Sequence, residues 1–437
     1  MKKILIVLLS CFMLLNINIP TALADENNVP ELVSHNVVLM DAKSKRILYE
    51  KNADEVKYPA SITKIMTMLL GVENGNFDDI VTMSHYAVYS IESGSSHIAL
   101  NENEQITLKM LLEASSIASA NDAANGIAEY IGKSNEGFTQ LMNDRAKSIG
   151  CTNTHFVNAH GLHDENHYST ARDMALIMQT AIQNEKYLEI TKITNDFVPP
   201  TNLQPQKRPL NTNNRVMQKN SPYYIPEVIS SKTGYTDQAR HSIVSYASKD
   251  GKELIVSIMD CESAKGMYED TKKLLNYGFE NYIEKTDIND LLDFPSIHTP
   301  FKLHVPSSPI VGLKEPFKNT LMTQSELNHI SFTYDYPTEI NEVTNKDTVI
   351  GTCSLLINDQ IIQTSDVVLQ VDITSKLNNF LTFVFTVLKW FIIAIILAII
   401  SLIIAKKLYI AHRRKKRKKM RELKRRQEAR KKYYNDL

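Results

Sequence analysis

A serine and a lysine three positions apart stand at the start of an apolar helical run. Proline is tolerated at the beginning of a helix, so Pro59 predicts that a helix begins near Ser61. Residues i and i+3 share one face of a helix, so Lys64 can reach the hydroxyl of Ser61. A neutral lysine amine can take the proton of a serine and make its oxygen nucleophilic. The alternative is a helix cap followed by a surface lysine, because a single Ser-x-x-Lys motif is a weak signal.

Two further motifs with polar side chains follow along the chain. Ser119 and Asn121 lie at the junction of two expected helices, where either residue could instead cap the second helix. Lys232, Thr233 and Gly234 lie on an expected strand. Ser-x-x-Lys, Ser-x-Asn and Lys-Thr-Gly in this order are the signature of penicillin-binding proteins and serine β-lactamases. The set is far more specific than any one of its members.

Apolar periodicity predicts the elements that must position these motifs. Apolar alternation or short apolar runs predict strands at 37–40, 46–49, 227–234, 240–248 and 253–260. Apolar stripes at helical spacing predict helices from near Ser61 to residue 70 and at 106–118, 122–131, 138–148 and 271–282. Asp250 and Gly251 predict a hairpin turn between the last two strands. The Lys-Thr-Gly motif is therefore expected on a strand of an antiparallel sheet, where Gly234 allows close approach of a ligand.

Histidines are concentrated in one expected loop, at positions 155, 160, 163 and 167. A helical zinc motif needs two histidines one turn apart on a firm element with an acidic partner. Gly161, Asp164 and Asn166 interrupt any helix here. We therefore expect a loop with no metal, and no cofactor is indicated elsewhere.

The N-terminus has the features of a signal peptide. Lys2 and Lys3 precede an apolar stretch at 4–20, and an Ala-x-Ala cleavage site ends at Ala24. Residues 1–24 are therefore expected to direct export. A lipoprotein site at Cys11 fits less well, because apolar residues continue after the cysteine. The mature chain keeps only three cysteines, expected as free thiols rather than a disulfide scaffold: Cys151, Cys261 and Cys353.

The charge of the chain is strongly divided, although the total is zero. Residues 406–437 hold sixteen Lys and Arg against three Asp and Glu, a net charge of +13, so the rest carries −13. An apolar segment, 380–405, comes directly before this tail and is long enough for a transmembrane helix. The positive-inside bias places the tail in the cytoplasm and the preceding chain outside the cell membrane. Anionic lipid is the expected partner of the tail, in preference to nucleic acid.

Between Glu284 and the apolar segment, prolines become frequent and short strands alternate with turns. We expect a small β-rich domain at 285–375 that carries no reactive residues. The preceding region, 25–284, holds all three motifs and is expected to be the catalytic domain.

From residue 33 to 282 the sequence resembles the serine-type D-alanyl-D-alanine carboxypeptidases, the low-molecular-mass penicillin-binding proteins. The resemblance is carried by Pro59–Lys64, Ser119–Ala124, Phe156–Leu162, His167–Asp173 and Lys232–Thr236. It implies an α+β fold of the penicillin-binding protein and β-lactamase type, with a helical lobe against an antiparallel sheet. A looser likeness at 286–375 implies the small β-domain of this family. Relatives usually have glycine where this chain has Ala120, and many place an arginine near Lys249 to hold the substrate carboxylate.

The resemblance also implies roles for the motif residues. Ser61 would attack the bond between the last two D-alanines of a peptidoglycan stem peptide, with Lys64 accepting its proton. Ser119 would relay a proton to the departing D-alanine and Asn121 would orient the peptide. The remaining roles concern one strand: Lys232 and Thr233 would bind the terminal carboxylate at the close approach that Gly234 allows, and the backbone N–H groups of Ser61 and Tyr235 would form the oxyanion hole. Whether Lys249 also binds the carboxylate stays open. Penicillins would acylate Ser61, and the activity would serve cell-wall biogenesis and cell shape.

Other functions remain to be separated from this one. A β-lactamase needs a dedicated glutamate for deacylation, and no convincing glutamate element precedes Lys232. An endopeptidase or transpeptidase of the same family uses the same motifs. A non-catalytic, membrane-tethered envelope scaffold would not need Ser61, Lys64 and their partners.

Overall fold

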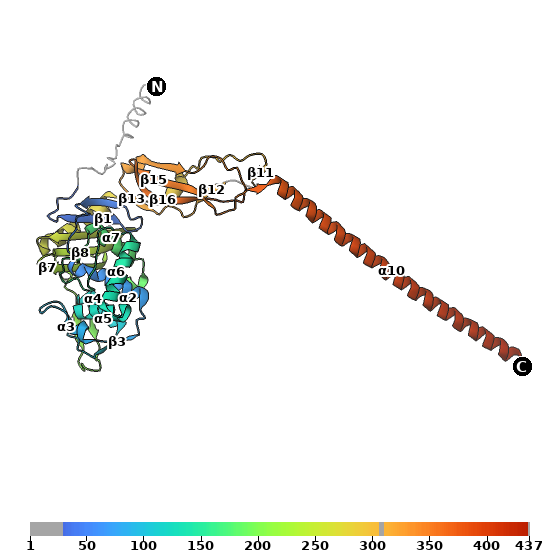
Figure 1. Ribbon diagram of the computed structural model, residues 1–437, viewed down its shortest axis with the longest axis horizontal. Coiled ribbons are helices and arrows are strands. Elements are labelled where there is room, and N and C mark those ends of the chain that lie inside the picture. The colour runs from blue at the N-terminus through green and yellow to red at the C-terminus, as the bar shows by residue number, and fades with distance from the viewer. Residues whose placement is uncertain (1–28, 306–309, 436–437) are drawn as a thin grey trace, which may run out of the picture. The chain divides into compact units, whose positions relative to one another are not determined.

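The computed structural model describes residues 29–305 and 310–435, with side chains up to residue 431. The predicted signal peptide at 1–24 lies outside the described residues. The chain forms two compact units, and each is described by itself. The first contains residues up to 292 together with 316–333 and 354–364, and the second contains 293–315, 334–353 and everything from 365 onward. Figure 1 labels their elements.

The first unit is built on a five-stranded sheet in which all neighbours are antiparallel. In spatial order the strands are β2 (Ile47–Lys51), β1 (Asn36–Asp41), β9 (Lys252–Cys261), β8 (Arg240–Lys249) and β7 (Val228–Thr236). β7 therefore lies at one edge of the sheet. This edge strand carries the Lys-Thr-Gly motif, so backbone groups on its outer side face away from the ladder.

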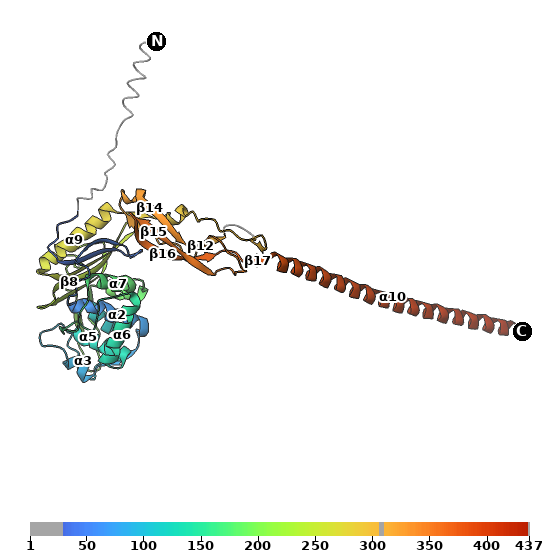
Figure 2. The ribbon, with the colours of Figure 1, turned by 45° about the horizontal axis from the view of Figure 1, so that its top comes forward.

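Side chains alternate between two hydrophobic cores on the two faces of the sheet. On β8, Ile243 packs in one core and Val244 in the other. The first of these cores lies under α9 (Ala264–Asn281), which covers one face of the sheet as Figure 2 shows. The other core joins the sheet to the helices of the opposite face, namely α2 (Lys64–Asn74), α4 (Leu108–Ile117), α5 (Asn121–Gly132), α6 (Asn135–Ile149) and α7 (Ala171–Ala181).

Shorter elements complete the first unit up to residue 292. They are η1 (Ala60–Thr63), β3 (Ile80–Thr82), α3 (His85–Tyr89), β4 (Gln105–Thr107), α8 (Glu185–Thr191), β5 (Asn195–Val198), β6 (Arg208–Asn211), β10 (Ile283–Lys285) and η2 (Ile288–Leu291). β3 pairs with β4 and β5 with β6. The first unit thus combines a group of helices with an antiparallel sheet, and the predicted α+β fold is confirmed.

One helix begins earlier than predicted and another was not predicted, because a capping hydroxyl rather than an apolar stripe marks the start of each. The helix expected from residue 271 begins at Ala264, because the Ser263 hydroxyl accepts a hydrogen bond from the Gly266 amide. α7, capped in the same way by Thr170, was not predicted. The predicted turn between β8 and β9 is confirmed: Asp250 and Gly251 both have positive φ, as a tight hairpin turn requires.

Short strands follow residue 292, as the sequence predicted for 285–375. They are β11 (Leu303–His304), β12 (Val311–Leu313), β13 (Thr320–Met322), β14 (Ile330–Asp335), β15 (Val349–Ile357), β16 (Gln360–Leu369) and β17 (Thr374–Ser375), with a single-turn helix η3 (Glu326–His329). Within the second unit, β12 pairs with β16 and β11 with β17. In the first unit, β13 pairs with β10, and Asp41 accepts a hydrogen bond from the Leu321 amide. The predicted domain boundaries at 284 and 375 stay predictions.

The C-terminal helix α10 (Lys376–Asn435) is continuous over 60 residues. Among the described residues it is the one helix long and apolar enough to cross a membrane. Its large apolar side chains between residues 377 and 404 are exposed to the surroundings, apart from the half-buried Ile393. The predicted span at 380–405 and the basic tail from 406 therefore belong to one helix, of about 90 Å at ~1.5 Å per residue.

Candidate active site

Ser61 lies in the middle of η1, and Lys64 begins α2 directly after it. The Ser61 side chain is half-buried, whereas Lys64 is 0% exposed. Lys64 Nζ lies 3.1 Å from Ser61 Oγ. The cap interpretation of Ser61 is wrong: the residues at the starts of η1 and α2 are Pro59 and Thr63, and neither makes a side-chain cap. The surface interpretation of Lys64 is also wrong.

Two carbonyl oxygens lie close to the Lys64 amine besides the serine. Asn121 Oδ1 is 2.7 Å away and the backbone oxygen of His160 is 2.8 Å away. Burial is the largest cause that holds the pKa of Lys64 well below its usual value, and the charge of Lys232 adds to it. Its surroundings therefore favour the neutral form of the amine over the charged form.

Ser119 and Asn121 occupy a sharp turn between α4 and α5. Ser119 has φ +56°, a left-handed conformation that a serine seldom adopts and that aims its side chain at β7. Lys232 Nζ donates to Ser119 Oγ at 2.9 Å and to the Thr233 carbonyl at 2.8 Å. The cap interpretation of Ser119 and Asn121 is wrong, because Ala120 is the N-cap of α5 and makes no side-chain cap.

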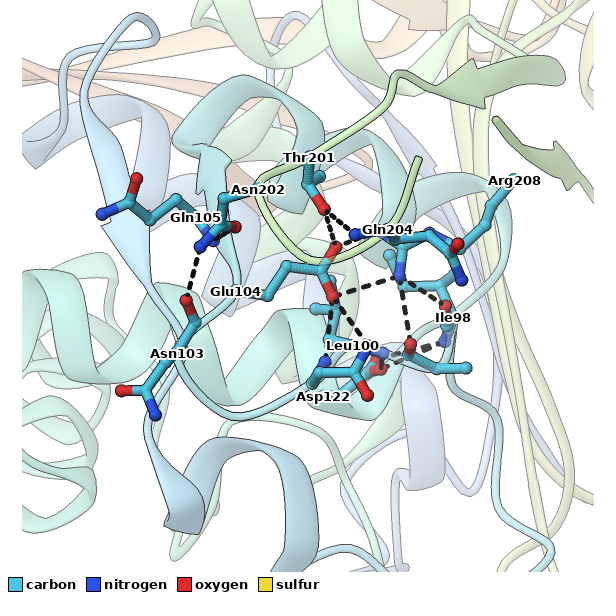
Figure 3. Close-up of polar contacts among 12 residues, drawn as sticks. Ile98, Leu100, Asn103, Glu104, Gln105, Asp122, Thr201, Asn202, Gln204 and Arg208 are labelled. Carbon is cyan, nitrogen blue, oxygen red and sulfur yellow. Dashed lines mark hydrogen bonds and ion pairs between the residues drawn. The ribbon is translucent and has the colours of Figure 1, made fainter. Parts of the chain in front are cut away.

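A buried polar network supports this turn (Figure 3). The Asp122 carboxylate accepts hydrogen bonds from the amides of Ile98 and Leu100, at distances of 3.1–3.3 Å. Burial raises the pKa of Asp122, which these amide contacts oppose. The network thus ties the residue after Asn121 to the preceding loop.

Glu104 holds a second part of the network, with 0% exposure. It forms an ion pair with Arg208 and accepts a hydrogen bond from Thr201 Oγ1 at 2.8 Å. Burial alone would raise the pKa of Glu104, but hydrogen bonds from Arg208 and Thr201 bring it below its usual value. Sequence reasoning missed this pair, because the two residues are 104 positions apart.

At Gly234, β7 lies so close to η1, the short helix that carries Ser61, that there is no room for a side chain. A Cβ atom at Gly234 would lie 2.8 Å from the backbone nitrogen of Ser61 and 2.9 Å from the Pro59 oxygen. Only glycine permits this approach. Lys232 is buried at 4% exposure, Thr233 is half-buried, and the side chain of Tyr235 is exposed. The predicted residues of the second and third motifs thus lie beside Ser61 and Lys64: Asn121 contacts Lys64, and Gly234 approaches Ser61.

The histidine-rich loop packs against η1, the short helix that carries Ser61. Gly161 has φ +86°, and a Cβ there would lie 1.9 Å from the Ala60 oxygen. His167 Nε2 lies 2.8 Å from Thr63 Oγ1, and burial lowers the pKa values of His160 and His167 to about 3, so both rings are neutral. Within the described residues, no group of three or more His, Cys, Asp or Glu is placed to hold a metal. The three predicted free cysteines are unpaired in the same part of the chain.

Lys249 lies at the end of β8 that is far from Thr233, so it is too distant to help bind a carboxylate there. It pairs with Lys252 beside the hairpin turn, whereas Thr233 pairs with Ile243. Six residues of strand separate Lys249 from that position, about 20 Å at ~3.3 Å per residue. Lys249 lies over the ring of Phe279 instead. The cation nearest the other end of β8 is Arg240, which pairs with Thr236.

Comparisons with known proteins relate the whole chain to a family and to solved structures. The family described as D-alanyl-D-alanine carboxypeptidase matches residues 23–263. The chain is 35% identical to the D-alanyl-D-alanine carboxypeptidase DacF of Bacillus subtilis, over 64% of this chain and 72% of that protein. It is 31% identical to DacA of Escherichia coli, over 57% of this chain but only 62% of the relative. Penicillin binding protein 5 from Haemophilus influenzae is similar in structure, with a TM-score of 0.66 and 26% identity, covering 79% and 99% of the two chains.

Proposed function

Because the chain belongs to the D-alanyl-D-alanine carboxypeptidase family, we propose that it removes the terminal D-alanine from peptidoglycan stem pentapeptides through an acyl-enzyme on Ser61. The observation that carries this proposal is a fully buried lysine amine 3.1 Å from a serine hydroxyl. Cell-wall biogenesis and cell shape are the processes that such trimming serves.

The three oxygens around the Lys64 amine suit either protonation state, and burial is what favours the neutral form that can act as a base. A neutral amine has two N–H groups and one lone pair. The carbonyl oxygens of Asn121 and His160 accept the two N–H groups, because neither oxygen can donate. The lone pair is left for the Ser61 hydroxyl, which then donates its proton as it attacks. Burial favours the same neutral form.

Acylation then proceeds with each motif in a separate role. Ser61 Oγ bonds to the carbonyl carbon between the two D-alanines while its proton passes to Lys64. The backbone N–H groups of Ser61 and Tyr235 stabilise the negative oxygen, at the close approach that Gly234 permits. The proton that Lys64 took from Ser61 is then passed, with Ser119 as the relay, to the departing amine as the peptide bond breaks, and Lys232, 2.9 Å from Ser119, keeps its own. Water later hydrolyses the ester, and Ser61 regains its proton.

We expect Lys232 to hold the carboxylate of the substrate, and its hydrogen bonds support this role. An ammonium group has three N–H donors, of which Ser119 and the Thr233 carbonyl take two. The third donor and the Thr233 hydroxyl remain for the carboxylate. Asn121 uses its oxygen on Lys64, which leaves its amide N–H₂ group for the bound peptide. Penicillins, which carry a carboxylate beside a reactive carbonyl, would enter by the same contacts.

Release of D-alanine from a purified pentapeptide tests the function directly. Turnover with stoichiometric free D-alanine is expected, together with a penicillin adduct that persists longer than the peptide acyl-enzyme. Rapid hydrolysis of penicillin would instead indicate a β-lactamase. Cleavage only of cross-linked dimers, or transfer to an amine acceptor, would indicate an endopeptidase or transpeptidase. A scaffold would give neither product nor adduct.

The pH dependence of kcat/KM should reveal the protonation of Lys64 and of Lys232. The kcat/KM for the pentapeptide should rise with pH as Lys64 loses its proton, because only the neutral amine accepts a proton. It should fall above about pH 7, up to ~10-fold per pH unit, because burial lowers the pKa of Lys232 to about 7 and the neutral form cannot pair with a carboxylate. Lys232→Arg keeps its charge, so the alkaline fall should disappear even if the maximum rate is lower. An unchanged alkaline limb in this variant would contradict the role of Lys232.

We infer that α10 anchors the protein in the cell membrane, with the catalytic unit outside and the basic tail in the cytoplasm on anionic lipid. The exposed apolar side chains before residue 405 and the net charge of +13 after it support this orientation. Protease added to intact cells should digest the region before residue 380 and spare the tail. Permeabilised cells, in which the tail is also digested, are the control. Digestion of the tail in intact cells would contradict this orientation.

A further inference from the structure

The most exposed large apolar side chain in the described part of the chain is that of Phe301, at 90%. It belongs to the second unit and lies in the turn just before β11. A single exposed apolar side chain is common on protein surfaces and needs no partner. The position of Phe301 beside the helix that we infer to cross the membrane is what gives this ring a meaning.

Strand pairing places the Phe301 turn at the start of α10. β11 is antiparallel to β17, with Leu303 opposite Ser375, and β17 runs directly into α10 (Figure 2). Because the two strands run in opposite directions, the residues before Leu303 lie at the end of this small sheet from which the helix leaves. Phe301 is therefore on the side of β11 that faces along the chain toward the apolar segment.

Two contacts hold this turn against the first residue of the helix. The Lys376 amide donates a hydrogen bond of 3.0 Å to the Lys302 carbonyl. The Lys376 ammonium group lies 3.8 Å from the centre of the Phe301 ring, a cation–π contact. Residues 300–304 and 374–380 contain two lysines and no acidic residue, so the phosphate groups of lipids would be attracted to this end of the unit.

The length of the apolar segment determines how far this turn stands from the bilayer. Residues 380–405 form about 39 Å of helix, whereas the hydrocarbon core of a bilayer is ~30 Å thick. With residue 405 at the inner edge, an untilted helix would leave the core near residue 386, and the start of α10 would stand about 15 Å outside it. A tilt of about 40°, at the upper end of the usual range, keeps the whole segment in the core. The start of α10 then lies about 5 Å above the core, within a headgroup layer ~5–8 Å deep.

The side chains of the first turns of α10 favour the tilted placement. The tilt removes from water apolar residues that are 41–66% exposed, namely Leu377, Phe380, Leu381, Phe383 and Val384. Lys389 opposes the tilt, because its charge is drawn about 10 Å below the outer edge of the core and has to extend back toward the headgroups. Residues that contact the interface beside a helix set its tilt, so a further apolar ring at this level adds to the favourable side.

We propose that the turn holding Phe301 enters the outer headgroup layer of the cell membrane, so that the second unit contacts phospholipid beside α10. The ring lies at the boundary with the acyl chains, and Lys302 and Lys376 face the lipid phosphates. The inference rests on the proposed anchoring by α10. It adds a second membrane contact, which holds the helix in its tilted placement.

Tryptophan fluorescence tests the contact, because Trp390 is the only tryptophan of the chain. The full-length protein with Trp390→Phe and Phe301→Trp is reconstituted in vesicles of phosphatidylethanolamine and phosphatidylglycerol. Lipids brominated near the glycerol end of the acyl chains should quench the tryptophan at position 301, and lipids brominated near the chain ends should quench it less. Acrylamide, a quencher in the water, should reach it less than it reaches free tryptophan.

Ile361→Trp in the same Trp390→Phe background is the matched control. Ile361 is also an exposed apolar residue, at 64%, and lies at the opposite end of β16, about 26 Å from Leu369 at ~3.3 Å per residue. Acrylamide should quench this tryptophan, and neither brominated lipid should. The wild-type protein reports the span itself, because both brominated lipids should reach Trp390.

A second pair of variants tests the effect on the tilt. With Phe380→Trp as the reporter, again in Trp390→Phe, the added change Phe301→Glu should increase acrylamide quenching, because the helix loses its contact and rises toward water. Ile361→Glu should leave the quenching unchanged. Equal rates of penicillin labelling show that each variant is folded.

Three outcomes would overturn the contact and leave the span standing. The tryptophan at position 301 is as open to acrylamide as free tryptophan, or brominated lipids quench it no more than the one at position 361. In the third, it is shielded from acrylamide yet unaffected by brominated lipid, as contact with a second copy of the chain would give. Absence of lipid quenching of Trp390 in the wild-type protein would instead refute the membrane anchoring.

Discussion

Ser61→Ala should abolish the covalent penicillin adduct and lower the rate of D-alanine release by about 10⁴-fold or more, the size of effect seen when a nucleophile is removed. The oxygen that forms the acyl bond is missing, whereas the rest of the cleft stays in place. The free energy of unfolding should change by less than ~1 kcal/mol, because Ser61 caps no helix. Intact-protein mass spectrometry after incubation with penicillin gives the measurement.

Ser134→Ala is the control that separates chemistry from helix capping. The Ser134 hydroxyl accepts a hydrogen bond from the Gly137 amide at 3.0 Å and caps α6. Its loss should cost ~1 kcal/mol of stability and leave the penicillin adduct intact. A penicillin label on any residue other than Ser61 would refute the assignment of the nucleophile.

Lys64→Arg should lower the rate of acylation about 10²- to 10⁴-fold, although the positive charge is kept. Guanidinium stays protonated at any usable pH and cannot accept the serine proton. The measurement is the rate of penicillin adduct formation by stopped reaction and mass spectrometry. Lys147→Arg, on an exposed position of α6, is the matched control and should acylate at the wild-type rate.

The pocket of Lys64 is fully enclosed, so Arg could also disturb packing. Lys64→Met gives an uncharged side chain of similar length and serves as the second variant. It should acylate as slowly as Lys64→Arg, and its melting curve shows whether the fold is kept. Full-rate acylation in either folded variant would exclude Lys64 as the proton acceptor.

Much of the secondary structure was predictable from the sequence, because it depends on residues that are close to one another along the chain. Apolar alternation placed β7, β8 and β9, and the Asp250–Gly251 turn between the last two follows from the positive φ angles that these residues tolerate. The three motifs were recognisable because each is contiguous. The division of charge at residue 405 likewise required only composition.

Local patterns failed where a helix depends on one capping hydroxyl or where partners are distant. The start of α9 was misplaced because Ser263 begins the helix before its apolar stripe does. The ion pair between Glu104 and Arg208 joins two loops that share no periodicity. Whether Lys249 could reach the carboxylate stayed open, because sequence distance does not show which end of a strand lies beside Thr233.

By itself, the sequence determined which side chains could react: Ser61, Lys64, Ser119 and Lys232 all stand in short contiguous motifs. Only the tertiary structure decided which protonation state each side chain favours and which atoms it contacts. In the proposed mechanism Lys64 is the base, and packing favours this because it removes the amine from water and surrounds it with carbonyl acceptors from elements 57 and 96 residues away. A pKa depends on desolvation and on charges in space, and neither is encoded in any local stretch of chain.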